Sequence, residues 1–500
     1  MSGQNYHRRM SEAKAEQPAD TNSYDIPLPT PLREAIARGW DPAPPMPHHA
    51  RPDGAPFAAR RREAVSERFA GRALVIPAGV AKTRANDTEY PFRAGSAFTW
   101  LTGETVEGAV LVMAPDGAEH TATLYVREYA GPGEVGYFAS RSHGAVWVGN
   151  VPTPEETAQI LGLRCRGLGD LARDLEGLRS QETLVLSGLD PTVDAALPGR
   201  VAGELARVID ELRLRKDEWE IARLRDACAA TARGFADVAR ELPRVLGRAD
   251  IRGERWLEGT FWRRARLEGN EVGYTSIVGS GEHATVLHWW RNHGSITPGQ
   301  LLLADMGIET DELYTADVTR TMPVDGSWTP AQLKVYRAVA EAQEAGISEV
   351  KAGADFLAAH RAAMYVIAEH LHDWGILDVP ADVSCDPDPE RPGAGLHRRY
   401  TLHGTSHMLG LDVHDCAHAR DELYRDGPLG AGYVLTVEPG LYFQANDRSV
   451  PAELRGIGVR IEDDILVTDG SPINLSAALP RHPDDIVTWM REAQSTPASP

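Results

Sequence analysis

The sequence predicts an α/β (α+β) protein, with two domains behind a proline-rich arm. Three observations lead to this prediction. The chain has 500 residues, which is more than a single hydrophobic core usually organises. Strand-like apolar runs alternate with amphipathic helical stretches along most of its length. Polar residues and then prolines fill the first 55 residues, a composition that cannot bury much surface.

The N-terminal part divides into the arm, residues 1–55, and a first domain, residues 56–205. We expect the arm to be partly disordered, with one short helix around Leu32 to Arg38. An amphipathic helix is predicted from Phe57 to Gly71, where the glycine ends it. Runs with strand character follow at 73–79, 96–103, 108–114, 122–128 and 182–188.

A second domain is predicted over residues 206–490. Asp217 and Glu220 form a capping-box-like helix start, and Thr329 followed by Pro330 marks another. The first of these helices repeats apolar or small residues three and four apart, which predicts one buried face. Runs with strand character lie at 300–308, 313–324, 400–415, 432–443 and 456–468. We expect them to form a mixed or antiparallel sheet.

Charge, hydropathy and cysteine spacing disfavour several classes of binding partner and several cellular locations. The formal net charge of −20 disfavours nucleic acid and anionic membranes, because both would repel the chain. No segment approaches 18 uninterrupted apolar residues, and the first residues lack the apolar region of a signal peptide. The four cysteines form no CxxC pair, which fits a reducing compartment. A cytoplasmic protein is the expectation.

Acidic residues interrupt several of the apolar runs in the second domain. Alternate residues of a strand share a face, so Glu462 shares its face with Arg460 within VRIEDDILV. The same pattern places acids on one face of three other runs, at Asp305, Asp317 and Glu438. Any one of them could face water at a strand end or pair with an arginine. If all four converge in a site of low dielectric, their repulsion forces either protonation or the binding of a cation.

Two divalent cations would neutralise four carboxylates, and histidines near the acids would complete such a centre. TLHGTSHMLGLDVHD contains three of them, His403, His407 and His414. Glycine follows the first, so the run is not HExxH and does not predict a zincin. Four oxygen donors and one nitrogen donor suit Mn(II) best, although Co(II) and Zn(II) can occupy mixed sites. Two metals about 3.5 to 4 Å apart would hold a bridging hydroxide and polarise a carbonyl, which predicts hydrolysis.

At these residues the chain resembles the pita-bread metallopeptidases, and among them most closely the Xaa-Pro aminopeptidases, also called aminopeptidase P. The matching blocks run in the family's order between about Lys216 and Asp469, and they are VLHWWRN, LLLADMG, YTADVTRTMPV, HGTSHMLGLDVHD, LTVEPGLYF and GIGVRIEDD. TRANDTEYPFRAGSAFTWLTGETVEGAVLVM resembles the segment that precedes the catalytic domain in aminopeptidase P and some prolidases. The resemblance implies a creatinase/aminopeptidase P-like N-terminal domain followed by a pita-bread catalytic domain.

The resemblance also implies roles for single residues. Metal ligands would be Asp305 as a terminal ligand, Asp317 and Glu462 as bridges, and His407 and Glu438 at the second ion. Three histidines would face the substrate: His288 near the scissile amide nitrogen, His414 near the carbonyl oxygen, and His403 along the pocket wall. Glu438 would also accept a proton from the bridging water, and Arg460 would orient a ligand carboxylate. Asp305 and Asp317 are one residue further apart than is usual in the family, which predicts a bulge or longer turn around residues 309–313.

The predicted activity is hydrolysis of the N-terminal Xaa-Pro bond in peptides with proline second, with two divalent metal ions as cofactors and Mn(II) as the expected metal. A prolidase with the same metals but specific for dipeptides is the first alternative. A metal-free binding module and a creatinase-like enzyme both conflict with the five ligands, and GTSHM lacks the closing glycine of a serine hydrolase motif. The resemblance also implies a homo-oligomer, either a dimer or a tetramer.

Overall fold

The structure is a computed structural model. It describes residues 29–36, 38–40, 52–86, 88–131, 133–134, 136–140, 143–200 and 203–496. The chain divides into two compact units, Met1–Ala206 and Arg207–Pro500, which are described here one at a time. Most of the predicted arm lies outside the described residues, but helix α2 (Thr30–Ile36) falls where the sequence predicts a short helix. Among the described residues, no helix is both long enough and apolar enough to cross a bilayer.

The first unit is built on a five-stranded sheet with the order β6-β5-β4-β1-β7. Its central strands β1, β4 and β5 pair antiparallel. The two edge strands are parallel to their neighbours: β7 pairs with β1, and β6 pairs with β5. The strands are β1 (Ala73–Pro77), β4 (Val110–Asp116), β5 (Glu119–Val126), β6 (Arg164–Gly167) and β7 (Thr183–Val185). A separate hairpin joins β2 (Thr83–Ala85) and β3 (Thr88–Glu89).

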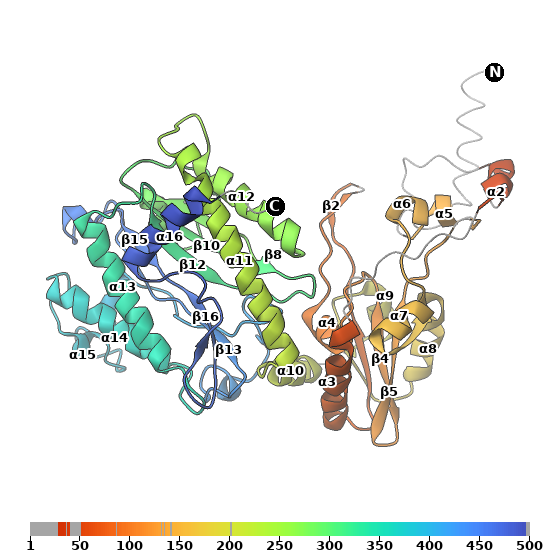
Figure 1. Ribbon diagram of the computed structural model, residues 1–500. Helices are drawn as coiled ribbons and strands as arrows, with labels where there is room; N and C mark the ends of the chain where they lie inside the picture. The colour runs from red at the N-terminus through yellow and green to blue at the C-terminus, as the bar shows by residue number, and fades with distance from the viewer. Residues whose placement is uncertain are drawn as a thin grey trace, which may run out of the picture. The chain divides into compact units, whose positions relative to one another are not determined.

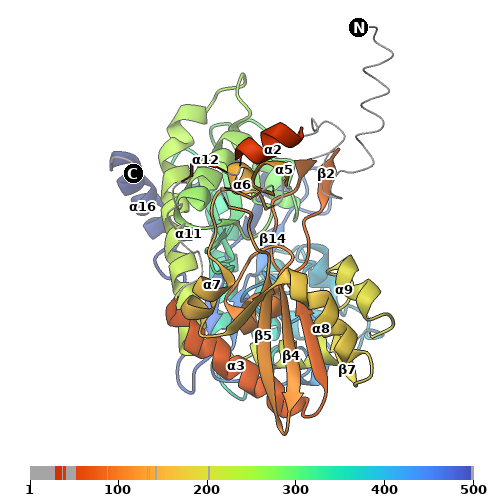
Figure 2. The same ribbon diagram turned by 90° about the vertical axis from the view of Figure 1, so that its right-hand side faces the viewer.

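Helices cover this sheet, with α3 beside it on one side and α8 and α9 on the other (Figure 2). Val75, Tyr125, Leu175 and Val193 are part of the core between the sheet and these last two helices. The helices and 3-10 turns are η2 (Pro52–Gly54), α3 (Ala55–Arg68), α4 (Ser96–Thr102), α5 (Gly136–Ala139), α6 (Ala145–Val148), α7 (Pro154–Leu161), η3 (Leu168–Asp170), α8 (Leu171–Leu178) and α9 (Pro191–Ala196).

One predicted strand of the first unit is wrong. Residues 96–103 are rich in aromatic and β-branched residues, but they form helix α4 rather than a strand. Phe98, Trp100 and Leu101 are all buried, so the run shows neither strand alternation nor a polar helix face. Gly103 takes a left-handed conformation, φ 74°, and ends the helix as a glycine C-cap does. Burial on all sides therefore removed the periodicity that distinguishes the two structures.

The helices of the second unit flank its strands, α11 with α12 on one side and α13 with α14 on the other (Figure 1). Asp217 caps α11 in a capping box with Glu220, and Thr329 caps α13 with Pro330 in its first turn, as predicted. The division between the two units falls within α10. The helices and 3-10 turns are α10 (Gly203–Arg213), α11 (Glu218–Val245), α12 (Gly253–Glu268), η4 (Gly281–Thr285), α13 (Pro330–Ser348), α14 (Ala358–Asp373), α15 (Ala381–Ser384), η5 (Leu396–Arg399), η6 (Asp421–Leu423), η7 (Ala452–Leu454) and α16 (Pro483–Ser495).

The described strand pairs of the second unit are all antiparallel, which is one of the two arrangements predicted. Two three-stranded sheets have the orders β12-β10-β9 and β13-β16-β17, and two pairs join β11 with β8 and β14 with β15. The strands are β8 (Glu271–Val272), β9 (Ile277–Ser280), β10 (Leu301–Met306), β11 (Ile308–Glu309), β12 (Val318–Pro323), β13 (Val434–Val437), β14 (Gly440–Tyr442), β15 (Gly458–Arg460), β16 (Asp463–Leu466) and β17 (Ile473–Asn474).

Four of the predicted strands in this unit are interrupted or absent, and the first, 300–308, divides at Gly307 into β10 and β11. Residues 400–415 form a loop, which touches the sheet through an isolated bridge between Met408 and Leu435. The run 432–443 breaks at Glu438 and Pro439, where proline has no N–H for a ladder. The run 456–468 breaks between β15 and β16, at Ile461 and Glu462. Acidic side chains at these breaks are free of the sheet's alternation and can turn into the space between the sheets.

Candidate metal centre

Five segments of the second unit bring the five predicted ligands to one cavity of about 730 Å³. Asp305 lies near the end of β10, Asp317 directly precedes β12, and Glu438 directly follows β13. Glu462 lies between β15 and β16, and His407 comes from the loop 400–415. Each ligand therefore stands at or just beyond a strand end, or on a loop, where its side chain can point inward. All five line the same cavity.

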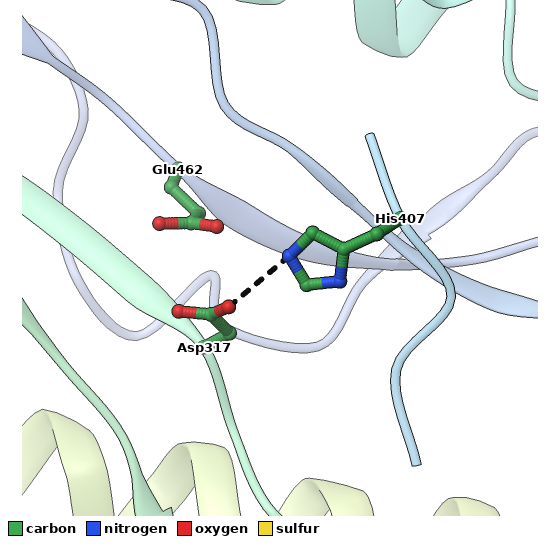
Figure 3. A group of neighbouring side chains, drawn as sticks. All are labelled: Asp317, His407 and Glu462. Carbon is green, nitrogen blue, oxygen red and sulfur yellow. Dashed lines mark ion pairs between the residues drawn. The ribbon is translucent and has the colours of Figure 1, made fainter. Parts of the chain in front are cut away.

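The centre of the group is the set Asp317, His407 and Glu462, whose side chains point towards one another from separate segments (Figure 3). One ligand atom from each lies within 4.8 Å of the other two. Nε2 of His407 is 3.3 Å from Oδ2 of Asp317 and 3.4 Å from Oε1 of Glu438. This spacing is close enough for one ion to contact several of the side chains at once.

Asp305 is held at the edge of this group by two donors. The Tyr274 hydroxyl donates to its Oδ1 at 2.7 Å, and Nη2 of Arg460 donates to its Oδ2 at 2.5 Å. Arg460 also donates from Nε to the Thr319 hydroxyl, which in turn donates to Oε2 of Glu462 at 2.6 Å. One arginine thus connects two of the predicted ligands, directly at Asp305 and through a hydroxyl at Glu462.

The pKa values of the group indicate an excess of negative charge. Burial and the charges of Asp317 and Glu438 raise the pKa of Glu462 well above its ordinary value. Burial raises the pKa of Glu438 to about 7, although the charge of His407 opposes the shift. Burial opposes protonation of His407, but the hydrogen bond to Asp317 and the charge of Glu438 raise its pKa to about 9. Oxygen-rich side chains that retain protons in this way fit divalent cations, which would remove the repulsion.

The acidic run 462–464 sends its three side chains to three different places. The side chain at 462 enters the cavity, whereas Asp463 pairs with the fully buried Arg320 at 2.7 Å. Oδ2 of Asp464 accepts the backbone N–H of Asp317 at 3.1 Å. The third acid therefore supports a predicted ligand from behind. These buried acids are thus accounted for by the cavity, an arginine and a backbone amide.

The three predicted substrate-facing histidines also line the cavity. Nε2 of His403 is 2.8 Å from the Tyr442 hydroxyl, and burial together with the charge of Arg460 lowers its pKa to about 4. The ring of His414 stands nearly perpendicular to that of His407, with centroids 4.4 Å apart, and burial lowers its pKa. His288 precedes the other two in the chain. It is exposed and lies on the loop between β9 and β10.

The chain between Asp305 and Asp317 makes a turn at residues 310–314, close to the range where the sequence predicts a bulge or longer turn. Thr310 and Tyr314 close this turn, with the N–H of Thr310 donating to the carbonyl of Tyr314. Leu313 adopts a left-handed conformation, φ 69°, which is costly for a branched residue. The turn leaves both aspartates facing the cavity.

Comparisons with known proteins agree with this geometry. Residues 222–469 match the family described as metallopeptidase family M24, and residues 57–186 match the N-terminal domain of aminopeptidase P. Xaa-Pro aminopeptidase 2 of Streptomyces coelicolor is 47% identical, over 94% of this chain and 98% of the relative. Xaa-Pro aminopeptidase 1 of the same organism is 49% identical over 86% of each chain. This chain belongs to metallopeptidase family M24.

Solved structures extend the comparison to the fold of this M24 chain. Aminopeptidase P from E. coli with the inhibitor Pro-Leu superposes with a TM-score of 0.77 at 30% identity, over 88% of this chain and 99% of that one. The predicted architecture is thereby confirmed: an aminopeptidase P N-terminal domain precedes a pita-bread catalytic domain. The prediction that the chain is a metallopeptidase is confirmed as well.

Several residues of this M24 site are missed by reasoning from the sequence. Tyr274, Thr319 and Tyr442 bond predicted ligands or the arginine beside them, and Asp464 supports Asp317 from behind. Thr319 shares its strand face with Asp317, so strand alternation could have found it. No spacing in the sequence singles out Tyr274, because it comes from a segment with no other member of the group.

Proposed function

We propose that this chain is a dinuclear-metal aminopeptidase that hydrolyses the N-terminal Xaa-Pro bond of peptides. The observation that carries the proposal is the convergence of four carboxylates and one imidazole on one cavity. Relatives that cover most of the chain are named Xaa-Pro aminopeptidases, which supports the same substrate class here.

Asp305, Asp317, His407, Glu438 and Glu462 would hold the two metal ions. Four carboxylates balance the charge of two divalent ions, and the oxygen-rich donor set favours Mn(II). When bound, the ions would supply the attacking hydroxide and polarise the carbonyl of the first residue. The two bonds that Arg460 and Tyr274 make to Asp305 would keep that carboxylate in place without an ion.

Glu438 is the residue proposed to carry the proton of the reaction. Its Oε1 faces His407 and Thr436, while Oε2 lies 3.6 Å from Nδ1 of His403. Burial and the charge of Asp317 disfavour a second negative charge at this position, and a carboxyl placed beside the attacking water can accept a proton and release it again. In this role Glu438 takes a proton from the attacking water and delivers it to the departing imino nitrogen.

The histidines are proposed to hold the peptide. His414 would donate to the oxyanion that develops on the carbonyl, and its lowered pKa keeps the ring neutral at neutral pH. His288 would lie near the scissile nitrogen, and His403 would line the pocket against Tyr442. A dedicated site of this kind suits Xaa-Pro, a tertiary amide without the N–H that other aminopeptidases can use.

The proposal is tested by loading the protein with Mn(II) and comparing three substrates: a Xaa-Pro-Yaa tripeptide, a Xaa-Pro dipeptide and a Xaa-Ala-Yaa tripeptide. We expect release of the first residue from the Xaa-Pro-Yaa tripeptide, at a rate well above that of the alanine peptide. Cleavage of the dipeptide alone would instead identify a prolidase. No cleavage of any substrate, together with no bound metal, would leave a peptide-binding module.

A further inference from the structure

The loop between β9 and β10 carries His288 and Trp290 to the cavity, and it is fastened at its base by a buried acid. That acid is Glu254, in the first turn of α12, whose side chain has no exposed surface. An isolated carboxylate in such a place would be costly. Its partners explain why it is tolerated.

Four donors saturate the Glu254 carboxylate, and all of them belong to the loop or to the end of β9. Oε1 accepts from the backbone of Ser280 at 2.9 Å and lies 2.7 Å from Nδ1 of His283. Oε2 accepts from the indole of Trp289 at 2.8 Å and from the backbone of Gly294 at 2.6 Å. A carboxylate offers about four acceptor positions, so none is left over.

Aromatic rings stack beside the Glu254 carboxylate, and two of them belong to its donors Trp289 and His283. The ring of Trp289 lies against those of His283 and His293, with centroids 3.9 and 5.0 Å away and interplanar angles of 23° and 27°. A Cβ at Gly294 would lie 2.8 Å from the carboxylate carbon of Glu254. Only glycine therefore allows the loop to pass this close to the acid.

A second fastening point lies two residues before Gly294. Asn292 is fully buried, with Oδ1 accepting from the N–H of Val278 and Nδ2 donating to the carbonyl of Ser276. Its φ of 45° is a left-handed conformation that asparagine tolerates better than most residues. Both ends of the segment that contains His288 are thus tied to the body of the unit.

We propose that Glu254 is a positioning residue for the reaction, because it fixes the loop that presents His288 to the substrate. The inference rests on the proposed function for the role of His288. The His288 ring makes no hydrogen bond with any other described residue, so the backbone of the loop sets its place. Glu254 accepts a hydrogen bond from Trp289, the residue directly after His288. It also bonds His283 before His288 and Gly294 after it.

The test is Glu254→Gln, which keeps the shape of the side chain but replaces one acceptor oxygen with an NH₂ that faces two donors. Asp237→Asn is the matched control. This aspartate of α11 is also buried, but its ion pairs are with Arg240 of α11 and Arg264 of α12 rather than with the loop between β9 and β10. Each variant is assayed with the Mn(II)-loaded protein on the Xaa-Pro-Yaa tripeptide, alone and combined with His288→Ala. Trypsin cleavage after the exposed Arg291 measures opening of the loop without any assay of activity.

We expect Glu254→Gln to lower kcat/KM about 10- to 100-fold, mostly through kcat, as misplacement of a substrate-facing group does. In the His288→Ala background the same change should alter kcat/KM less than about twofold, because the group it positions is gone. Cleavage after Arg291 should accelerate in Glu254→Gln and stay at the wild-type rate in Asp237→Asn.

Three results would overturn the inference: unchanged kcat/KM in Glu254→Gln, losses that multiply with His288→Ala, or unchanged cleavage after Arg291. If the wild-type protein cleaves no Xaa-Pro peptide, the proposed function fails, and the proteolysis experiment still decides whether Glu254 holds the loop.

Discussion

His360 is a partly buried histidine on helix α14. Its Nδ1 lies 3.2 Å from the hydroxyl of Thr405, in the loop that carries His403 and His407. Burial lowers its pKa to about 4, and the nearby His397 adds to the shift. The imidazole is therefore neutral in the folded chain at neutral pH, and it supports the loop as an uncharged group.

This burial predicts a pH dependence of stability. The unfolded chain binds the proton at about pH 6.5, whereas folded His360 binds it only near pH 4. The contribution of His360 is therefore fully present above about pH 6.5 and is lost as the pH falls towards 4. Between pH 7 and pH 5, the wild type should lose about 1 to 2 kcal/mol more unfolding free energy than His360→Asn. Denaturant titrations at the two pH values measure the difference.

His372→Asn is the control for this prediction, because His372 lies on the same helix but is exposed. Its pH dependence should match that of the wild type. Equal slopes for the wild type and His360→Asn would mean that His360 titrates normally in the folded chain.

At the residue scale, the metal ligands could be predicted from the sequence, but the residues that hold the surrounding loops in place could not. Asp317, Glu438 and Glu462 stand out because an acid in an apolar strand has few explanations. Glu254 does not stand out, since an acid in the first turn of a helix ordinarily complements the helix dipole at the surface. Its burial depends on donors that lie 26 to 40 residues further along the chain, and no local sequence pattern indicates them.

At the scale of elements, the strands break where the chemistry is. The sequence predicts continuous strands over 432–443 and 456–468, yet both break at the acids that enter the cavity. Alternation correctly identifies which side chains share a face, but a strand end gives an acid more freedom than a pleat does. The wrong strand at 96–103 has a different cause, because helix α4 is buried on every side.

A fully buried arginine joins the elements around the site. Arg320 of β12 pairs with Asp463 and donates to the carbonyls of Glu462, Leu479 and Pro480. Removing one partner of a buried ion pair leaves an uncompensated charge, so Arg320→Met should lower the unfolding free energy by about 3 to 5 kcal/mol. Thermal and denaturant unfolding measure the loss.

Arg420→Met provides the comparison, because Arg420 pairs with Glu211 while about half exposed, at 52% of its side-chain surface. An exposed pair contributes about 1 kcal/mol or less. Losses of similar size in the two variants would contradict the view that Arg320 holds β12 and β16 together.

At the scale of the whole molecule, the order of the blocks that match the family was enough to predict an N-terminal domain followed by a catalytic domain. The family matches over 57–186 and 222–469 confirm that architecture. All five predicted ligands and the three histidines lie in the second unit. The sequence could not predict the distances among them, which depend on how four strands and a loop end around one cavity.

The most direct test of the central claim is the metal content of the purified chain. Wild type and Asp317→Asn are loaded with Mn(II), desalted and measured by inductively coupled plasma mass spectrometry, with tripeptide hydrolysis assayed on the same samples. Close to two ions per wild-type chain are expected, and Asp317→Asn, which removes one of the proposed metal ligands, should lose both metal and activity. Full hydrolysis by a metal-free wild type, or an Asp317→Asn chain that keeps both its metal and its activity, would contradict it.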